Sequence, residues 1–250
     1  MEVQKVAVIS GSTSGIGYCI AEQLLGAGYY VYINGRSQKK CDQAYAKLTA
    51  ISPNVSCLVG DINCTENYIS WLRQLQTRHQ TIQLLVSNVG SGKYPNSQNI
   101  NIDVYNQAMG VNFFSAVTFC QEFISHLSQP SAVVFISSIA GAAPLGAPTP
   151  YACAKAALNM YMKEQALRFA KQSIRFNCIS PGNVMFDGST WDEKLQKDQG
   201  QTLDYIAKNV PMNCFIEPKS IANIVLTIAN TPELTGQNLV IDGGQIVGRS

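Results

Sequence analysis

Short apolar runs alternate with longer segments of mixed polarity along nearly the whole chain. The runs are rich in β-branched residues and lie at 6–9, 30–33, 55–59, 84–86, 133–136, 174–179 and 239–241. Between them, apolar residues recur at helical spacing near 15–27, 38–50, 64–78, 103–127, 151–171 and 219–230. Near-continuous apolar strands separated by helices are typical of a parallel sheet covered on both faces. The pattern predicts one α/β domain over residues 1–250, with a doubly wound sheet of seven strands.

One stretch interrupts this alternation. Residues 183–215, between the sixth predicted strand and the last predicted helix, are polar and rich in Asp, Lys and Gln. A long insertion after the carboxyl end of a strand is a candidate lid over an active site. An ordinary helical hairpin on the surface is the alternative.

The turn after the first predicted strand is rich in glycine. It opens the first predicted helix with the spacing Gly-x-x-x-Gly-x-Gly, and its residues are Gly11, Ser12, Thr13, Ser14, Gly15, Ile16 and Gly17. Glycine permits the tight turn and lets the backbone approach a pyrophosphate, while the positive end of the helix favours an anion. The turn therefore predicts a dinucleotide site. Another nucleotide, or a turn without a ligand, would also fit it.

The residues after the second predicted strand favour NADP(H) over NAD(H). A ribose 2′-hydroxyl is bound by Asp or Glu about 20 residues after the glycine turn, whereas a 2′-phosphate is bound by arginine. Here the chain reads Asn-Gly-Arg-Ser at 34–37, with no carboxylate before Asp42. Arg36 can form two hydrogen bonds with a phosphate, with Ser37 and the Lys39-Lys40 pair close by. The alternative is an exposed arginine in a polar turn.

Tyr151 and Lys155 are four residues apart in a predicted helix, so they lie on one face, one turn apart. An ammonium beside a phenol lowers the phenol pKa from its usual value of about 10, which suits a general acid/base. Ser138, just upstream, can donate a hydrogen bond to a substrate oxygen. Alone, Tyr-x-x-x-Lys also occurs on exposed helices, where the tyrosine packs and the lysine is solvated. With the cofactor turn, the three residues indicate interconversion of a carbonyl and an alcohol.

Composition excludes several classes of function. The net charge of +2 and the absence of a long basic run argue against nucleic acid as a partner. The eight cysteines are scattered, only two histidines are present, and no metal-ligand spacing occurs, so no metal is expected. Scattered cysteines of this kind are typical of reduced thiols in an intracellular protein. We find no signal-peptide pattern and no apolar stretch of the ~20 residues that a membrane helix needs. We therefore expect a cytoplasmic protein with no membrane partner.

Taken together, these motifs resemble the short-chain dehydrogenase/reductase family, whose single domain has a Rossmann-like fold. The resemblance covers essentially the whole chain, and it extends to 3-oxoacyl-carrier-protein reductases and to relatives in sugar and polysaccharide pathways. The matching elements are Gly11–Gly17, Asp61 after the third strand, Ser87-Asn88-Val89-Gly90 after the fourth, Asn112, Ser138, Tyr151, Lys155, Pro181-Gly182, and residues 235–244.

The resemblance implies a role for each matching residue. The implied catalytic residues are Asn112, Ser138, Tyr151 and Lys155. Beyond the glycine turn, Arg36 and Ser37, the implied cofactor-binding residues are Asp61, Ile62, Asn88, Gly90, Tyr151, Lys155, Pro181, Gly182 and Val184. Tyr151 would act as the general acid/base, while Lys155 would hold the nicotinamide ribose and lower the pKa of Tyr151. Asn112 would support a proton relay through Lys155.

Two positions depart from the family pattern. Ser87 replaces the first asparagine of the Asn-Asn-Ala-Gly element, a small polar exchange that the fold should tolerate. Phe186 stands where a threonine usually bonds the nicotinamide carboxamide. That role would pass to backbone groups or to Asp187, Ser189 or Thr190.

The substrate is not fixed by these residues. Asp187, Ser189, Thr190 and Trp191 would suit a polyol, so a small polar ketone or a sugar derivative is the first interpretation. A 3-oxoacyl group on acyl carrier protein is the alternative, although residues 113–131 contain no lysine or arginine for an acidic carrier. A cofactor-binding protein without catalysis is a third possibility, which the complete set of four catalytic residues disfavours. The resemblance also implies a homotetramer or homodimer formed through the helices at 103–127 and 151–171.

Overall fold

Strand residues alternate between the two faces of one sheet, and both faces are buried. In β1 (Val6–Ile9), Val6 and Val8 belong to one hydrophobic cluster, while Ala7 and Ile9 belong to another on the opposite face. Because side chains in a strand point alternately to either face, a strand buried on both sides reads as a continuous apolar run. This is why continuous apolar runs predicted the strands from the sequence.

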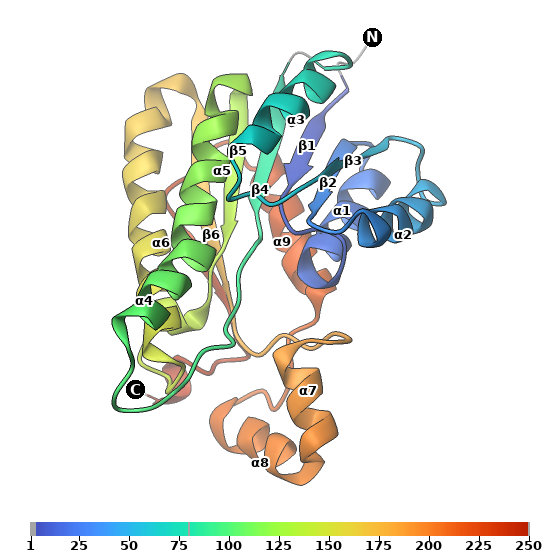
Figure 1. The fold of residues 1–250 in the computed structure, drawn as a ribbon. Coiled ribbons are helices and arrows are strands. Elements are labelled where there is room, and N and C mark those ends of the chain that lie inside the picture. The colour runs from blue at the N-terminus through green and yellow to red at the C-terminus, as the bar shows by residue number, and fades with distance from the viewer. Residues whose placement is uncertain (1–3, 80, 250) are drawn as a thin grey trace.

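The computed structural model describes residues 4–79 and 81–249, and its seven parallel strands follow the order β3-β2-β1-β4-β5-β6-β7. The strands after β1 are β2 (Tyr30–Gly35), β3 (Val55–Val59), β4 (Ile82–Ser87), β5 (Leu127–Ile136), β6 (Ile174–Pro181) and β7 (Asn238–Ile241). Helices cover the sheet on both sides (Figure 1). The predicted fold class, a Rossmann-like doubly wound sheet, is confirmed.

Each face of the sheet is covered by its own group of helices. One cluster contains residues of α1 (Gly15–Gly26), α2 (Gln38–Thr49) and α9 (Pro218–Asn230). The other contains residues of α3 (Glu66–Gln76), α5 (Ser115–Phe123) and α6 (Thr149–Phe169). Among the described residues, no helix is long and apolar enough to cross a membrane.

The segment predicted as one helix at 103–127 consists of several parts. α4 (Ile102–Met109) leads into a π-helical turn at Gly110–Phe114, which is followed by α5 and a 3₁₀ turn at Ile124–His126. Single π-turns inside helices are frequent at functional sites, because they redirect one side chain relative to its neighbours. Asn112 lies in this turn.

The chain reverses its direction of progress across the sheet between β3 and β4. It moves outward from β1 through β2 to β3, and then returns to place β4 beside β1 on the other side. Connections therefore leave the carboxyl ends of β1 and β4 in opposite directions, which opens a crevice where ligands of doubly wound sheets bind.

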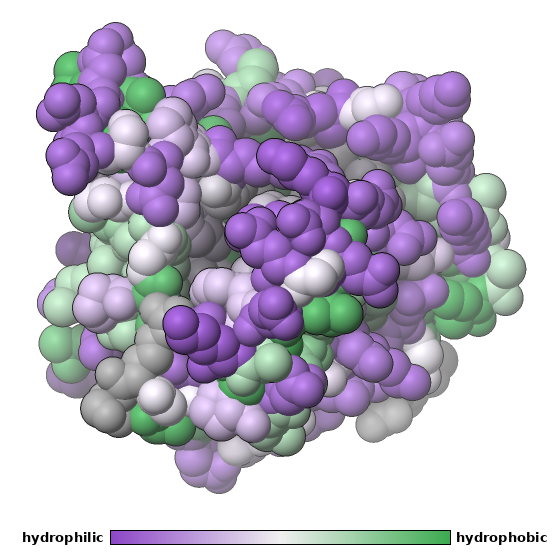
Figure 2. All heavy atoms as spheres, turned by 90° about the horizontal axis from the view of Figure 1, so that it is seen from below, coloured by the Kyte–Doolittle hydropathy of each residue, from purple (hydrophilic) through white to green (hydrophobic). Residues whose placement is uncertain are grey.

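Residues 183–215 form a helical hairpin beyond the carboxyl ends of the strands. Its helices are α7 (Thr190–Lys197) and α8 (Gln199–Asn209), and a parallel bridge between Val184 and Ile216 ties its base together. In Figure 1 the hairpin lies below the sheet, at the end where the crevice opens. Seen from this side, most of the surface is hydrophilic and its apolar residues lie in small groups (Figure 2).

Candidate active site

The glycine turn is held between the ends of β2 and β4 by two asparagines. Asn34 Oδ1 accepts a hydrogen bond from the Gly11 N–H at 3.2 Å, and Asn88 Nδ2 donates to the Gly11 carbonyl at 2.8 Å. The buried Ser12 hydroxyl donates to the Ile9 carbonyl at 2.8 Å and accepts from the Asn34 N–H at 2.9 Å. The side chain of Ser12 therefore shapes the turn, and Ser12, a predicted cofactor-binding residue, is fully buried and absent from the lining of the crevice cavity described next.

Two glycines of this turn are required by their surroundings. Gly15 has φ of +58°, and a Cβ there would lie 2.5 Å from the ring of Phe186. A Cβ on Gly17 would lie 2.6 Å from both Asn88 Nδ2 and the Gly11 carbonyl oxygen. Larger residues at either position would displace the turn or the side chains that hold it.

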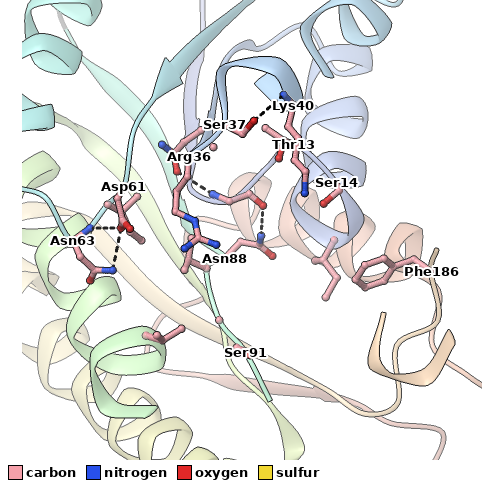
Figure 3. A pocket seen from close by; sticks show the side chains of 18 residues that line it. Thr13, Ser14, Arg36, Ser37, Lys40, Asp61, Asn63, Asn88, Ser91 and Phe186 are labelled. Atoms are coloured by element: carbon pink, nitrogen blue, oxygen red, sulfur yellow. Dashed lines mark hydrogen bonds between the residues drawn. The ribbon is translucent and has the colours of Figure 1, made fainter. Parts of the chain in front are cut away.

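A cavity of about 740 Å³ lies at the crevice, between the glycine turn and the loops after β2, β3 and β4 (Figure 3). Of the predicted cofactor residues, its lining contains Gly11, Thr13, Ser14, Ile16, Arg36, Ser37, Asp61, Ile62, Asn88 and Gly90. The lining also contains Lys40, Asn63 and Ser91. Residues from Gly11 to Phe186 thus surround one space large enough for a nucleotide.

Positive side chains enter this cavity at the end of β2. Arg36 and Lys40 both reach into it, from the end of β2 and from α2 (Figure 3). The Ser37 hydroxyl accepts a hydrogen bond from the Lys40 N–H at 3.4 Å and caps α2. Across the cavity, Asp61 Oδ1 accepts from the Asn63 N–H at 2.9 Å. The cavity therefore has a cationic end suited to a phosphate and, near Asp61, an acceptor suited to a base amine.

A second cavity of about 830 Å³ adjoins the first, and Ile16 and Phe186 line both. Ser138 and Tyr151 lie in its wall, close enough to each other for the Ser138 side chain to lower the pKa of Tyr151. Ser138 leads the short turn after β5, where its hydroxyl also accepts from the Ala140 N–H at 3.2 Å. Gly182 and Val184 line the same cavity, and Pro181 is the buried last residue of β6.

Lys155 is buried behind Tyr151. Only 3% of its surface is exposed, and its Nζ donates to the Ile136 carbonyl at 2.9 Å. The Nζ lies 5.9 Å from the centroid of the Tyr151 ring, as expected for residues one helical turn apart. The described residues provide no carboxylate in ion-pair contact with this ammonium.

Burial dominates the electrostatics of this pair. It lowers the pKa of Lys155 from 10.5 to about 8. Burial also raises the pKa of Tyr151 above 10, and the nearby Ser138 side chain lowers it by a smaller amount. This direction is opposite to the one predicted from the Tyr-Lys spacing. The reason is that the low-dielectric surroundings disfavour phenolate and ammonium alike.

Asn112 and Gly90 complete the surroundings of Lys155. The buried Asn112 accepts from the Ser91 N–H at 2.9 Å and directs its Nδ2 to the Tyr94 hydroxyl at 3.2 Å. A Cβ on Gly90 would lie 3.0 Å from Asn112 Oδ1 and 3.2 Å from Lys155 Nζ. Glycine at position 90 therefore leaves the space around the lysine and asparagine open.

Phe186 separates the two cavities instead of offering a polar group. Of the side chains expected to replace the missing threonine, Asp187 is exposed and lies outside both linings. The Ser189 hydroxyl caps α7 by accepting from the Asp192 N–H at 3.0 Å. Ser189, Thr190 and Trp191 all line the second cavity.

Several residues of the two cavities were not recognised in the sequence. Asn34 holds the glycine turn, Tyr94 meets Asn112, and Lys194 and Gln245 line the second cavity. Only Asn34 could have been recognised from its local sequence. A polar residue near the end of a buried apolar strand needs a hydrogen-bond partner. Among the described residues, no cluster of His, Cys, Asp and Glu could hold a metal ion.

The chain belongs to the short chain dehydrogenase family, which it matches over residues 5–198. It is 29% identical to dehydrogenase/reductase SDR family member 4 of Oryctolagus cuniculus, over 96% of this chain and 93% of that protein. It is 25% identical to the 3-oxoacyl-[acyl-carrier-protein] reductase FabG of Chlamydia pneumoniae, over 97% of both chains. It also resembles the structure of L-sorbose reductase from Gluconobacter frateurii, complexed with NADPH and L-sorbose, with a TM-score of 0.89, 25% identity and 97% coverage of each chain. The chain is therefore an oxidoreductase of this family.

Lys155→Met should make the protein more stable at pH 7. A lysine whose pKa is lower in the folded state than in the unfolded state destabilises the folded protein. The full penalty applies at pH values below the folded-state pKa. The penalty disappears as pH rises from about 8 towards 10.5. The pKa shift corresponds to a destabilisation of about 3 kcal/mol. Lys155→Met should recover only part of this, because it also loses the hydrogen bond to the Ile136 carbonyl.

Urea denaturation at pH 7 and pH 9 tests this expectation. The advantage of Lys155→Met over the wild type should shrink at pH 9. Lys163→Met, at an exposed position of the same helix, should change stability by less than about 0.5 kcal/mol. A Lys155→Met protein less stable than the wild type at pH 7 would contradict the account of the buried charge.

Proposed function

We propose that this protein interconverts a ketone and a secondary alcohol with NADP(H), using Tyr151 as the general acid/base. The observation that carries the proposal is that Ser138 and Tyr151 lie together in the wall of a cavity that adjoins the crevice cavity. A substrate oxygen between the two hydroxyls would lie next to the place where a nicotinamide ring is expected. That arrangement suits hydride transfer followed by protonation.

The first cavity fits a phosphorylated dinucleotide. The glycine turn presents its backbone and the start of α1, and Arg36 and Lys40 supply two positive charges for a 2′-phosphate. Asp61 and Ile62 line the same cavity, and we expect them to contact the adenine. When bound, the cofactor supplies the hydride, and the protein supplies orientation and electrostatics.

The raised pKa of Tyr151 favours the direction of carbonyl reduction, because the phenol stays protonated at neutral pH and can donate. Ser138 donates a hydrogen bond to the same substrate oxygen, where negative charge develops. Lys155 holds a positive charge behind the phenol, and it remains largely protonated below about pH 8. Asn112 positions the Tyr94 hydroxyl and borders the space around Lys155, as a relay of protons would require.

The second cavity favours a small polar carbonyl compound or a sugar derivative as substrate. Hydroxyl groups of Tyr94, Thr190 and Tyr205 and the amides of Asn96 and Gln245 lie in its lining. The indole of Trp191 lies among them, and sugars stack on aromatic faces. A 3-oxoacyl-carrier-protein substrate is the second candidate. It is favoured by the apolar segment of the lining at 139–148 and by the FabG relative.

We also propose that the chain forms a homodimer or homotetramer through α5 and α6. Large apolar side chains are exposed on α6 and on the π-turn that leads into α5, namely Met160 at 58%, Leu167 at 79% and Phe114 at 54%. Such residues in neighbouring elements form a surface suited to burial against a second copy.

Tyr151→Phe should lower the rate of carbonyl reduction by about 10²–10⁴-fold, because it removes the proton donor and leaves the cofactor cavity unchanged. The rate is followed by NADPH oxidation at 340 nm with L-sorbose and with an acetoacetyl thioester, which also ranks the two substrate classes. Tyr45→Phe, at an exposed position, is the matched control. Near-normal turnover by Tyr151→Phe, with intact NADPH binding, would refute the assigned role.

Leu167→Asp should reduce the mass of the protein in solution, because a buried carboxylate cannot be accommodated in an apolar interface. Light scattering coupled to size-exclusion chromatography measures the mass. Leu203→Asp introduces the same charge at an exposed leucine of α8 and should leave the mass unchanged. An unchanged mass for Leu167→Asp, or a monomeric wild type, would show that this face is not the interface.

A further inference from the structure

The lining of the second cavity is positively charged. Its titratable side chains are Lys93, Tyr94, Tyr151, Lys194 and Tyr205, and no carboxylate or histidine of the described residues is among them. Lys93 and Lys194 are the charged side chains of this lining, so they set the sign of the cavity.

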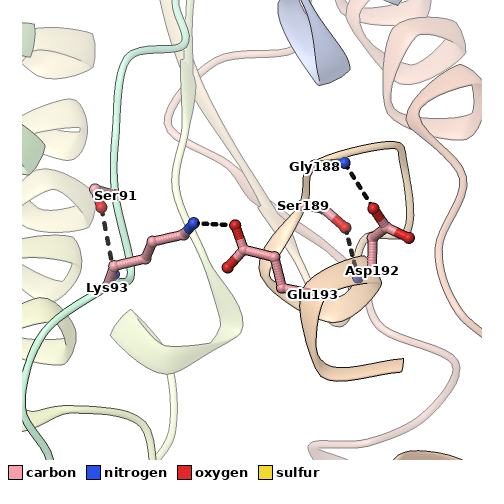
Figure 4. Close-up of polar contacts among 6 residues, drawn as sticks. All are labelled: Ser91, Lys93, Gly188, Ser189, Asp192 and Glu193. Atoms are coloured by element: carbon pink, nitrogen blue, oxygen red, sulfur yellow. Dashed lines mark hydrogen bonds and ion pairs between the residues drawn. The ribbon is translucent and has the colours of Figure 1, made fainter. Parts of the chain in front are cut away.

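Lys93 has a carboxylate partner outside the lining. It lies in the loop after β4 and forms an ion pair with Glu193 of α7, and both side chains are about half exposed (Figure 4). This pair connects the loop after β4 to the hairpin. Because it is exposed and locally neutral, it adds little charge for a ligand.

Among the described residues, no carboxylate forms an ion pair with Lys194. The two acidic residues beside it on α7 are engaged elsewhere, since Glu193 pairs with Lys93 and Asp192 accepts from the Gly188 N–H at 2.8 Å (Figure 4). The Lys194 Nζ lies over the indole of Trp191, 4.2 Å from the ring centroid, which fixes its position. Partial burial lowers the pKa of Lys194.

We propose that the substrate is a polyhydroxylated carbonyl compound with an anionic group, a carboxylate or a phosphate, which Lys194 binds away from the reacting carbonyl. The inference rests on the proposed function, because it takes Ser138 and Tyr151 as the other end of the same cavity. A single ammonium held on an indole, in a cavity of about 830 Å³ without a carboxylate, is a specific recognition point for an anion. Hydroxyls and amides between the two ends would bind the polyol.

Three matched probes test this proposal: sorbitol, gluconate and sorbitol 6-phosphate. They share a six-carbon polyol and differ in one terminal group. Each is titrated by calorimetry into the protein saturated with NADPH, so that no hydride can be accepted. At least one anionic probe should bind at least tenfold more tightly than sorbitol. The two anionic probes distinguish a carboxylate site from a phosphate site.

Lys194→Met should abolish the preference for the anionic probe, and Lys194→Arg should retain most of it. Lys197→Met, on the same helix but outside the lining, should behave like the wild type. Equal binding of all three probes, no binding of the anionic probes, or a preference that survives in Lys194→Met would overturn the proposal. Failure to bind NADPH in the first place would instead contradict the proposed function.

Discussion

Asn34 and Asn88 hold the glycine turn from its two sides, and the position of the whole site depends on these contacts. The turn follows β1, while the asparagines come from the end of β2 and from the residue after β4. Because β1 lies between β2 and β4 in the sheet, the turn is tied to both neighbours at the point where the crevice opens. A shift of this turn would move the start of α1 relative to Tyr151, and hydride transfer tolerates little displacement.

The buried Lys155 lowers the stability of the fold and provides a charged group for the proposed reaction. Lys155 keeps an ammonium in the interior with one carbonyl as its hydrogen-bond partner, at a cost of about 3 kcal/mol. A protein under selection for stability alone would place an apolar side chain there. Gly90 leaves space beside the lysine, and Asn112 provides polar groups there. The cost in stability is explained if the ammonium binds ribose hydroxyls and takes part in a proton relay.

Much of the fold could be predicted because the strands are buried on both faces and the turns carry glycine. All seven strands were expected within a few residues of their observed bounds, except β5, which begins earlier at Leu127. The π-turn around Asn112 was not predicted, because it leaves no mark in the apolar spacing.

Of the candidate site, the residues at strand ends could be named from motifs. Tyr94 and Lys194 could not, since each meets its partners only through folding. The direction of the Tyr151 pKa was also predicted wrongly. Sequence spacing shows which residues are neighbours on a helix. Burial decides the direction of the pKa shift of Tyr151, and burial depends on how the whole interior packs.

The central claim is that the crevice cavity receives NADP(H), and direct titration with NADPH and NADH tests it best. Binding is followed by nicotinamide fluorescence for the wild type, for Arg36→Ala, and for Lys39→Ala as a neighbouring control outside the cavity lining. The account predicts that the wild type and Lys39→Ala bind NADPH at least about tenfold more tightly than NADH, and that Arg36→Ala loses most of this preference. Equal or tighter binding of NADH by the wild type would contradict the role of Arg36. Binding of neither cofactor would contradict the assignment of the site.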